Sequence, residues 1–150
     1  MANSYYAVYE HIVFSTKNRV NWFSPEFRPE LFAYFAGAIK NQNCHSLIVG
    51  GHDNHVHLLL RKHGDLRTRD LVKELKRNSS IWMKEKGVGF RKFYWQTGFG
   101  AFSVSYWDLE KIANYIRNQA EHHGRMSWGV EYKKLLIKHG VEFDERYYLD

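Results

Sequence analysis

The sequence predicts an α+β fold, in which helices pack on an antiparallel sheet. Runs rich in aromatic and β-branched residues alternate with helical patterns of apolar residues, and only a glycine-rich turn separates the second and third strand-like runs. The 150 residues, 44% hydrophobic and 17% aromatic, suffice for one domain with its own core and exclude a disordered chain. We therefore expect a single domain over residues 1–150.

The first half of the chain predicts the order strand, helix, strand, strand. Residues 5–16 are rich in aromatic and β-branched side chains and are typical of a strand. Over residues 24–43 apolar side chains recur at helical spacing, with Ser24 as the cap and Pro25 in the first turn. Two short strand-like runs then flank the turn GGHDN and predict a hairpin: 45–49 and 56–61.

The second half adds helix, strand and two helices. Residues 65–86 form an amphipathic pattern that ends at Gly87, and residues 93–106 return to strand composition with two glycines, where a bulge or a close backbone approach is expected. Helices are predicted at 108–123 and from about 130 to 139. The order is therefore β-α-β-β-α-β-α-α, the ferredoxin-like arrangement that RRM-like domains share.

Positive charge is concentrated in one segment. The net charge is +6 with a pI near 9.4, and residues 61–92 hold eleven Lys and Arg against four acids, which accounts for the whole excess. Clustered basic charge favours binding to the phosphates of a nucleic acid, although a solvated helix face is the ordinary alternative. The candidate DNA-binding residues are Lys73, Lys76, Arg77 and Lys84 on the basic helix, with Arg61, Arg91 and Lys92 beside it.

Nothing in the sequence predicts export or membrane insertion. No apolar run approaches the roughly 20 residues of a membrane-spanning helix. The N-terminus has neither the basic flank nor the apolar stretch of a signal peptide, and the single Cys44 cannot form an internal disulfide. We expect a reduced, cytoplasmic location without membrane contact.

Two histidines stand one residue apart in the second hairpin strand. Alternate side chains of a strand share a face, so His55 and His57 point one way, while Val56, Leu58 and Leu60 point the other. Two adjacent imidazoles can hold one metal ion, although hydrogen-bonded histidines at the sheet surface remain an alternative.

A tyrosine and a glutamine stand four residues apart on the predicted helix at 108–123. This spacing makes Tyr115 and Gln119 neighbours on one helix face, at the edge of the apolar stripe. On their own they could be an interfacial aromatic and a solvated amide.

Together, these residues resemble a known family. The strand His55-Val56-His57 with the helix Tyr115-x-x-x-Gln119 is similar to the prokaryotic single-tyrosine HUH transposases. Further strings in the same order resemble the REP-associated tyrosine transposases and their insertion-sequence relatives, over nearly the whole chain: HIVFSTKNR, HVHLLL, WQTGFGAFSVS, YIRNQAEHH and LLIKHGVEFDERYYL.

The resemblance implies a metal-dependent nuclease and strand transferase that acts on single-stranded DNA, commonly folded as a hairpin. Tyr115 would be the nucleophile and would form a 5′-phosphotyrosine, and His55, His57 and Gln119 would bind Mg²⁺ or Mn²⁺. Such neutral ligands leave the charge of the ion undiminished for polarising a phosphate. No nucleotide cofactor is implied. The likeness also suggests a homodimer, with the tyrosine helix of one subunit serving the partner's metal site as one arrangement.

The chain departs from its relatives just before the first histidine. Many relatives carry an acid there, whereas this chain has Asn54, preceded by Asp53. An amide oxygen can still orient an imidazole, but it raises the basicity of the ligand less than a carboxylate does. His52, His122 and His123 are spare histidines, for which surface or supporting positions are expected.

Three alternatives remain at this point. A noncatalytic RRM-like module shares the element order, and TGFGAFSV resembles its aromatic motif, but Thr97 and Ala101 break that motif. A zinc hydrolase would also use a His-x-His strand, with a third histidine or carboxylate and an activated water in place of the tyrosine. A domesticated transposase would keep DNA binding alone.

Overall fold

The computed structural model describes residues 3–150, apart from the side chains at positions 122 and 123. Its centre is a four-stranded, fully antiparallel, open sheet with the strand order β2-β3-β1-β4. The strands are β1 (Tyr9–Ser15), β2 (His45–Gly51), β3 (His55–Arg61) and β4 (Gly100–Val104). The inner strands β1 and β3 pair on both edges, so they form the most protected part of the sheet.

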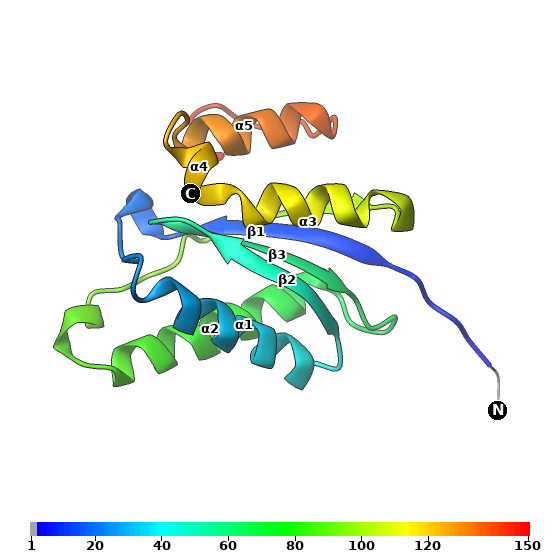
Figure 1. Ribbon diagram of the computed structural model, residues 1–150, viewed down its shortest axis with the longest axis horizontal. Coiled ribbons are helices and arrows are strands. Elements are labelled where there is room, and N and C mark those ends of the chain that lie inside the picture. The colour runs from blue at the N-terminus through cyan, green and yellow to red at the C-terminus, as the bar shows by residue number, and fades with distance from the viewer. Residues whose placement is uncertain (1–2) are drawn as a thin grey trace.

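Helices cover both faces of this sheet (Figure 1). One face carries α1 (Arg28–Asn41) and α2 (Thr68–Glu85), and the other carries α3 (Leu109–Arg117), α4 (Gln119–His123) and α5 (Trp128–Lys138). Three short 3₁₀ turns lie at the junctions: η1 (Lys17–Arg19), η2 (Val88–Phe90) and η3 (Tyr106–Asp108). In residues 3–150 no helix combines the length and the apolar character that crossing a membrane requires.

The two faces of β3 are used differently, as the alternation in its sequence predicts. Val56, Leu58 and Leu60 belong to the larger core, which packs against α1 and α2. His55 and His57 are also fully buried, because they point to the opposite face, where they contact residues of α3, α4 and α5. The α+β class and the order of the main elements are therefore confirmed.

The beginning of the chain corrects two predicted boundaries. β1 starts at Tyr9 rather than at residue 5, and α1 starts at Arg28, with Pro29 rather than Pro25 in its first turn. The cause is a separate turn ahead of the helix, in which the amide of Phe27 donates to the carbonyl oxygen of Ser24 at 3.1 Å and to its hydroxyl at 3.3 Å.

The predicted strand at 93–106 is largely wrong, since β4 covers only Gly100–Val104. Phe93 and Trp95 enter the larger core instead, and Trp95 makes only an isolated bridge with Thr16. The expected close approach occurs at Gly100, where a Cβ atom would lie 2.8 Å from the ring of Tyr132 in α5. A side chain there would push α5 away from the sheet.

The predicted helix at 108–123 is two helices. Asn118, with φ −93° and ψ 20°, interrupts the regular backbone between α3 and α4. α3 lies directly on β2, where a Cβ atom on Gly50 would be 2.6 Å from the side chain of Ile116. The break then lets α4 turn toward the start of β3.

Candidate metal and tyrosine site

Each histidine of β3 is oriented by a hydrogen bond on its Nδ1 atom. His55 Nδ1 lies 2.9 Å from the Asn54 side-chain oxygen, and His57 Nδ1 lies 2.8 Å from Nε2 of His11 in β1. Burial and the neighbouring His57 hold the pKa of His11 well below its usual range, so His11 is neutral and its Nε2 can accept a hydrogen bond from Nδ1–H of His57. Both Nε2 atoms are then directed away from the sheet as ligand atoms.

Asn54, which stands where many relatives have an acid, therefore orients the imidazole of His55. Its side-chain oxygen faces His55, while its amide nitrogen donates to the backbone oxygen of Arg19 at 3.2 Å. The second bond fixes which way the amide group points.

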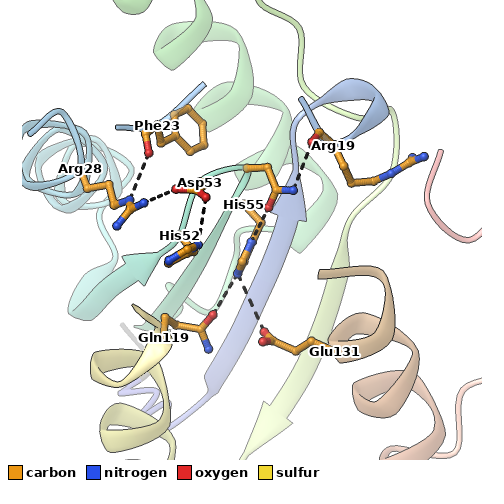
Figure 2. A network of polar contacts seen from close by, with 9 residues as sticks. Arg19, Phe23, Arg28, His52, Asp53, His55, Gln119 and Glu131 are labelled. Carbon is orange, nitrogen blue, oxygen red and sulfur yellow. Dashed lines mark hydrogen bonds and ion pairs between the residues drawn. The ribbon is translucent and has the colours of Figure 1, made fainter. Parts of the chain in front are cut away.

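Gln119 lies at the start of α4 and is almost completely buried. Its side-chain oxygen is 2.9 Å from Nε2 of His55 (Figure 2). The break at Asn118 allows this contact, because α4 points its first residue down to the sheet. The structure thus brings together His55, His57 and Gln119.

Glu131 is the residue that sequence reasoning missed. It projects from α5, is 2% exposed, and its Oε1 lies 2.8 Å from Nε2 of His57 and 4.0 Å from Nε2 of His55. A carboxylate so deeply buried requires charged or hydrogen-bonding neighbours. A signal was present in the sequence, since Glu131 shares a helix face with the buried Trp128 and Leu135.

Tyr115 of α3 completes the cluster. Its ring centroid lies 5.6 Å from that of His57 and 6.2 Å from that of His11, each in an edge-on arrangement. Burial, together with the charge and hydrogen bonding of Glu131, raises the pKa of Tyr115 above its ordinary value. The phenol is therefore protonated, and the tyrosine lies beside the histidines of its own chain.

The indole of Trp128 closes the opposite side of the cluster. It stacks on His55 with ring centroids 4.2 Å apart and planes inclined by 16°, and it stacks in turn on Tyr132. These apolar walls limit the access of water to the polar atoms between them, which strengthens electrostatic interactions there.

The donor set fits a divalent ion. One ligand atom each from His55, His57 and Glu131 lies within 4.8 Å of the others, and the Gln119 oxygen adjoins His55. Imidazole nitrogens with carboxylate and amide oxygens suit Mn²⁺, Mg²⁺ or Zn²⁺, and the cluster brings no thiolate that would favour softer ions. The sequence predicted only neutral ligands, but Glu131 adds a negative charge to the set.

Of the three spare histidines, the structure describes the side chain of His52. His52 Nδ1 lies 3.5 Å from a carboxylate oxygen of Asp53, and Asp53 also pairs with Arg28 of α1 (Figure 2). This ion pair fixes the hairpin turn to α1. The side chains of His122 and His123 lie outside the described residues.

Most of the predicted DNA contacts lie away from this site. Lys73, Lys76, Arg77 and Lys84 are on α2, across the sheet from Tyr115. Arg61 ends β3, six residues and therefore about 20 Å from His55. Arg91 and Lys92 follow η2, on the chain segment that leaves α2.

Lys76 has other partners. Its ammonium group donates to the carbonyl oxygens of Gln96, Thr97 and Gly98 at 2.8, 3.3 and 2.6 Å. It also lies 5.2 Å from the ring centroid of Phe14. Lys76 thus joins α2 to the segment before β4, and its three protons are directed to the protein itself.

Comparison with solved structures gives two neighbours of similar fold. A protein from Deinococcus radiodurans R1, described as a candidate transposase, is 22% identical with a TM-score of 0.63, over 79% of this chain and 95% of that one. A REP-associated tyrosine transposase bound to a REP hairpin is 14% identical with a TM-score of 0.60, over 84% of this chain and 75% of that one.

The curated proteins contain no match to this sequence. The family described as "Transposase IS200 like" matches residues 4–119, which include the histidine strand, Tyr115 and Gln119. The match spans most of the chain and ends before α5. The chain therefore belongs to the IS200-like transposase family.

Proposed function

We propose that this transposase cuts and rejoins single-stranded DNA through a covalent bond to Tyr115. The phenol oxygen attacks a phosphodiester phosphorus, its proton leaves, and the departing 3′ oxygen takes up a proton. The product is a 5′-phosphotyrosine and a free 3′ hydroxyl. Because the tyrosine ester conserves the phosphodiester linkage, a 3′ hydroxyl can later displace Tyr115 without a nucleotide cofactor.

The observation that supports this proposal most directly is the cluster of Tyr115, His57 and Glu131 within one chain. His55, His57, Gln119 and Glu131 would hold Mn²⁺ or Mg²⁺. When bound, such an ion supplies Lewis-acid polarisation of the scissile phosphate. Glu131 would receive the phenol proton, because its carboxylate lies close enough to Tyr115 to raise the pKa of the phenol.

The DNA partner and the assembly state belong to this proposal as well. The solved relative bound to a REP hairpin supports hairpin DNA as the substrate. The basic residues of α2 other than Lys76 would contact a part of the DNA that lies away from the scissile bond, because α2 is across the sheet from α3. A homodimer stays a prediction, but exchange of the tyrosine helix between subunits is not needed to build the site.

The test is formation of a covalent protein–DNA adduct. Purified protein is incubated with labelled single-stranded hairpin DNA and Mn²⁺, and a band of reduced mobility in denaturing gels is expected. Tyr115→Phe should abolish it, and chelation of the metal should do the same. The control is Tyr94→Phe, which removes the same hydroxyl from an exposed tyrosine. An adduct that persists in Tyr115→Phe would refute the proposal.

Glu131 also supports a second candidate function. Two histidines and one glutamate form a ligand set that catalytic zinc sites use. In that case water, and not Tyr115, would attack the phosphodiester. Strand cleavage that survives in Tyr115→Phe, without any adduct and with Zn²⁺ as the supporting ion, would favour this hydrolase.

A further inference from the structure

A cavity between α3 and α5 opens onto the tyrosine. Its volume is about 320 Å³, and its lining includes Tyr115 together with the buried His11 and Glu131. This is near the small end of the range for ligand pockets, about 300–1,000 Å³. The cavity can take a single nucleotide unit but not duplex DNA.

Three lysines line the same cavity. Lys111 comes from α3, one helical turn before Tyr115, and Lys134 and Lys138 come from α5, one turn apart on one helix face. All three are exposed. Within residues 3–150, no ion pair joins any of the three to a described carboxylate, whereas the adjacent Lys133 pairs with Glu145 at 2.7 Å.

The walls between these charges are apolar. Ile112, Met126 and Leu135 line the cavity along with the lysines. An anionic ligand with an apolar body fits this combination, since phosphates would meet the ammonium groups while a base and sugar would contact the apolar walls. A DNA strand that enters this cavity would bring a phosphodiester beside Tyr115.

We propose that the cavity holds the nucleotide next to the bond that Tyr115 attacks, and that Lys111, Lys134 and Lys138 neutralise the phosphates of that single strand. The inference rests on the proposed function and extends it to the path of the substrate. Lys134 and Lys138 lie beyond residue 119, where the family match ends. These lysines would bind the phosphates of the strand and would not contact the reacting atoms.

The experiment measures binding separately from chemistry. Fluorescence anisotropy with a short labelled thymidylate strand is followed across a salt series, on the full chain in a Tyr115→Phe background and without metal. The triple variant Lys111→Ala, Lys134→Ala, Lys138→Ala should bind about tenfold or more weakly, and the slope of log K against log salt should fall by about 2, near 0.7 for each lost single-strand phosphate contact. Circular dichroism should show an unchanged fold, because all three side chains are exposed.

Two matched controls locate the effect. Lys134→Ala should weaken binding, but Lys133→Ala, the same change one residue away, should not. The α2 triple variant Lys73→Ala, Arg77→Ala, Lys84→Ala removes the same charge across the sheet and should leave the short strand's affinity unchanged. Equal losses in both triple variants, or wild-type affinity in the cavity variant, would overturn the proposal.

A separate assay distinguishes failure of this inference from failure of the proposed function. The same lysine changes are made with Tyr115 intact, and adduct formation is measured. Wild-type adduct with unimpaired binding in the lysine variant would overturn the cavity proposal alone. If the wild type forms no adduct but the lysine variant binds the strand more weakly, the result would support single-strand binding in the cavity and refute the tyrosine chemistry.

Discussion

The two faces of the sheet differ in the polar groups that they bury, although the same strands build both and each face has an apolar cluster. Toward α1 and α2, Ile12 and Phe14 of β1 and the apolar side chains of β3 pack into the larger core. Toward α3, α4 and α5, the same strands present His11, His55 and His57, and the helices bury Gln119 and Glu131 against them. Adjacent residues of β3 therefore contribute to different things: those on one face stabilise the core, and those on the other form the polar site. Substitutions on each face should separate the two.

His57→Ala should have the largest effect on function. It removes the imidazole that contacts both Glu131 and His11, so Mn²⁺ binding and adduct formation should fall to background while the larger core stays intact. Titration calorimetry and the adduct assay measure these losses. His45→Ala makes the same change at an exposed position of β2 and should retain both activities. Normal metal binding in His57→Ala would remove this histidine from the site.

Leu58→Ala should have the largest effect on stability. The side chain is fully buried against α1 and α2, and the loss of a leucine from a packed core costs about 2–5 kcal/mol. Urea denaturation gives the change in unfolding free energy. The variant, while folded, should bind Mn²⁺ as the wild type does, because Leu58 points away from the histidines. A selective loss of metal affinity would mean that the two faces are coupled.

Glu131→Gln should affect the site more moderately. It keeps the shape of the side chain but removes the negative charge beside His57, so affinity for Mn²⁺ should fall about 10–100-fold. The stabilisation of the protein by Mn²⁺ in thermal unfolding should shrink accordingly. Glu142→Gln, at an exposed position, is the matched control. Unchanged affinity in Glu131→Gln would leave metal binding to His55, His57 and Gln119.

Lys76→Met should have the smallest effect and should act on stability. It deprives three carbonyl oxygens of their donor, which costs about 1 kcal/mol because water can partly replace it. Lys73→Met, on the exposed side of α2, should cost less. Equal stability of the two variants would show that the contacts to carbonyl oxygens contribute nothing.

The same lysine predicts a pH dependence. Burial lowers the pKa of Lys76 from 10.5 to about 8, so between these pH values the unfolded chain binds more protons than the folded one. The unfolding free energy should therefore gain a rising contribution from about pH 8 to 10.5, which Lys76→Met lacks. Urea denaturation of both proteins across this range measures the difference.

Local pattern in the sequence was sufficient for the α+β class, the hairpin and the division of β3 into two faces. Alternation along a strand has a period of two, so the common direction of His55 and His57 follows from their spacing alone. The family resemblance added Tyr115 and Gln119, and the structure places both beside the histidines. It did not add Glu131, which lies between two of the similar strings and reaches His57 only through the packing of α5 on the sheet.

Only the tertiary structure decided which distant elements meet. Glu131 contacts His57 although more than seventy residues separate them in the chain, and His11 contacts His57 from β1. The break at Asn118 directs Gln119 to His55. The basic charge of α2 was evident from composition, but its position across the sheet from Tyr115 was not. Spacing determines the face on which a side chain lies, whereas the packing of helices on the sheet determines what that face contacts.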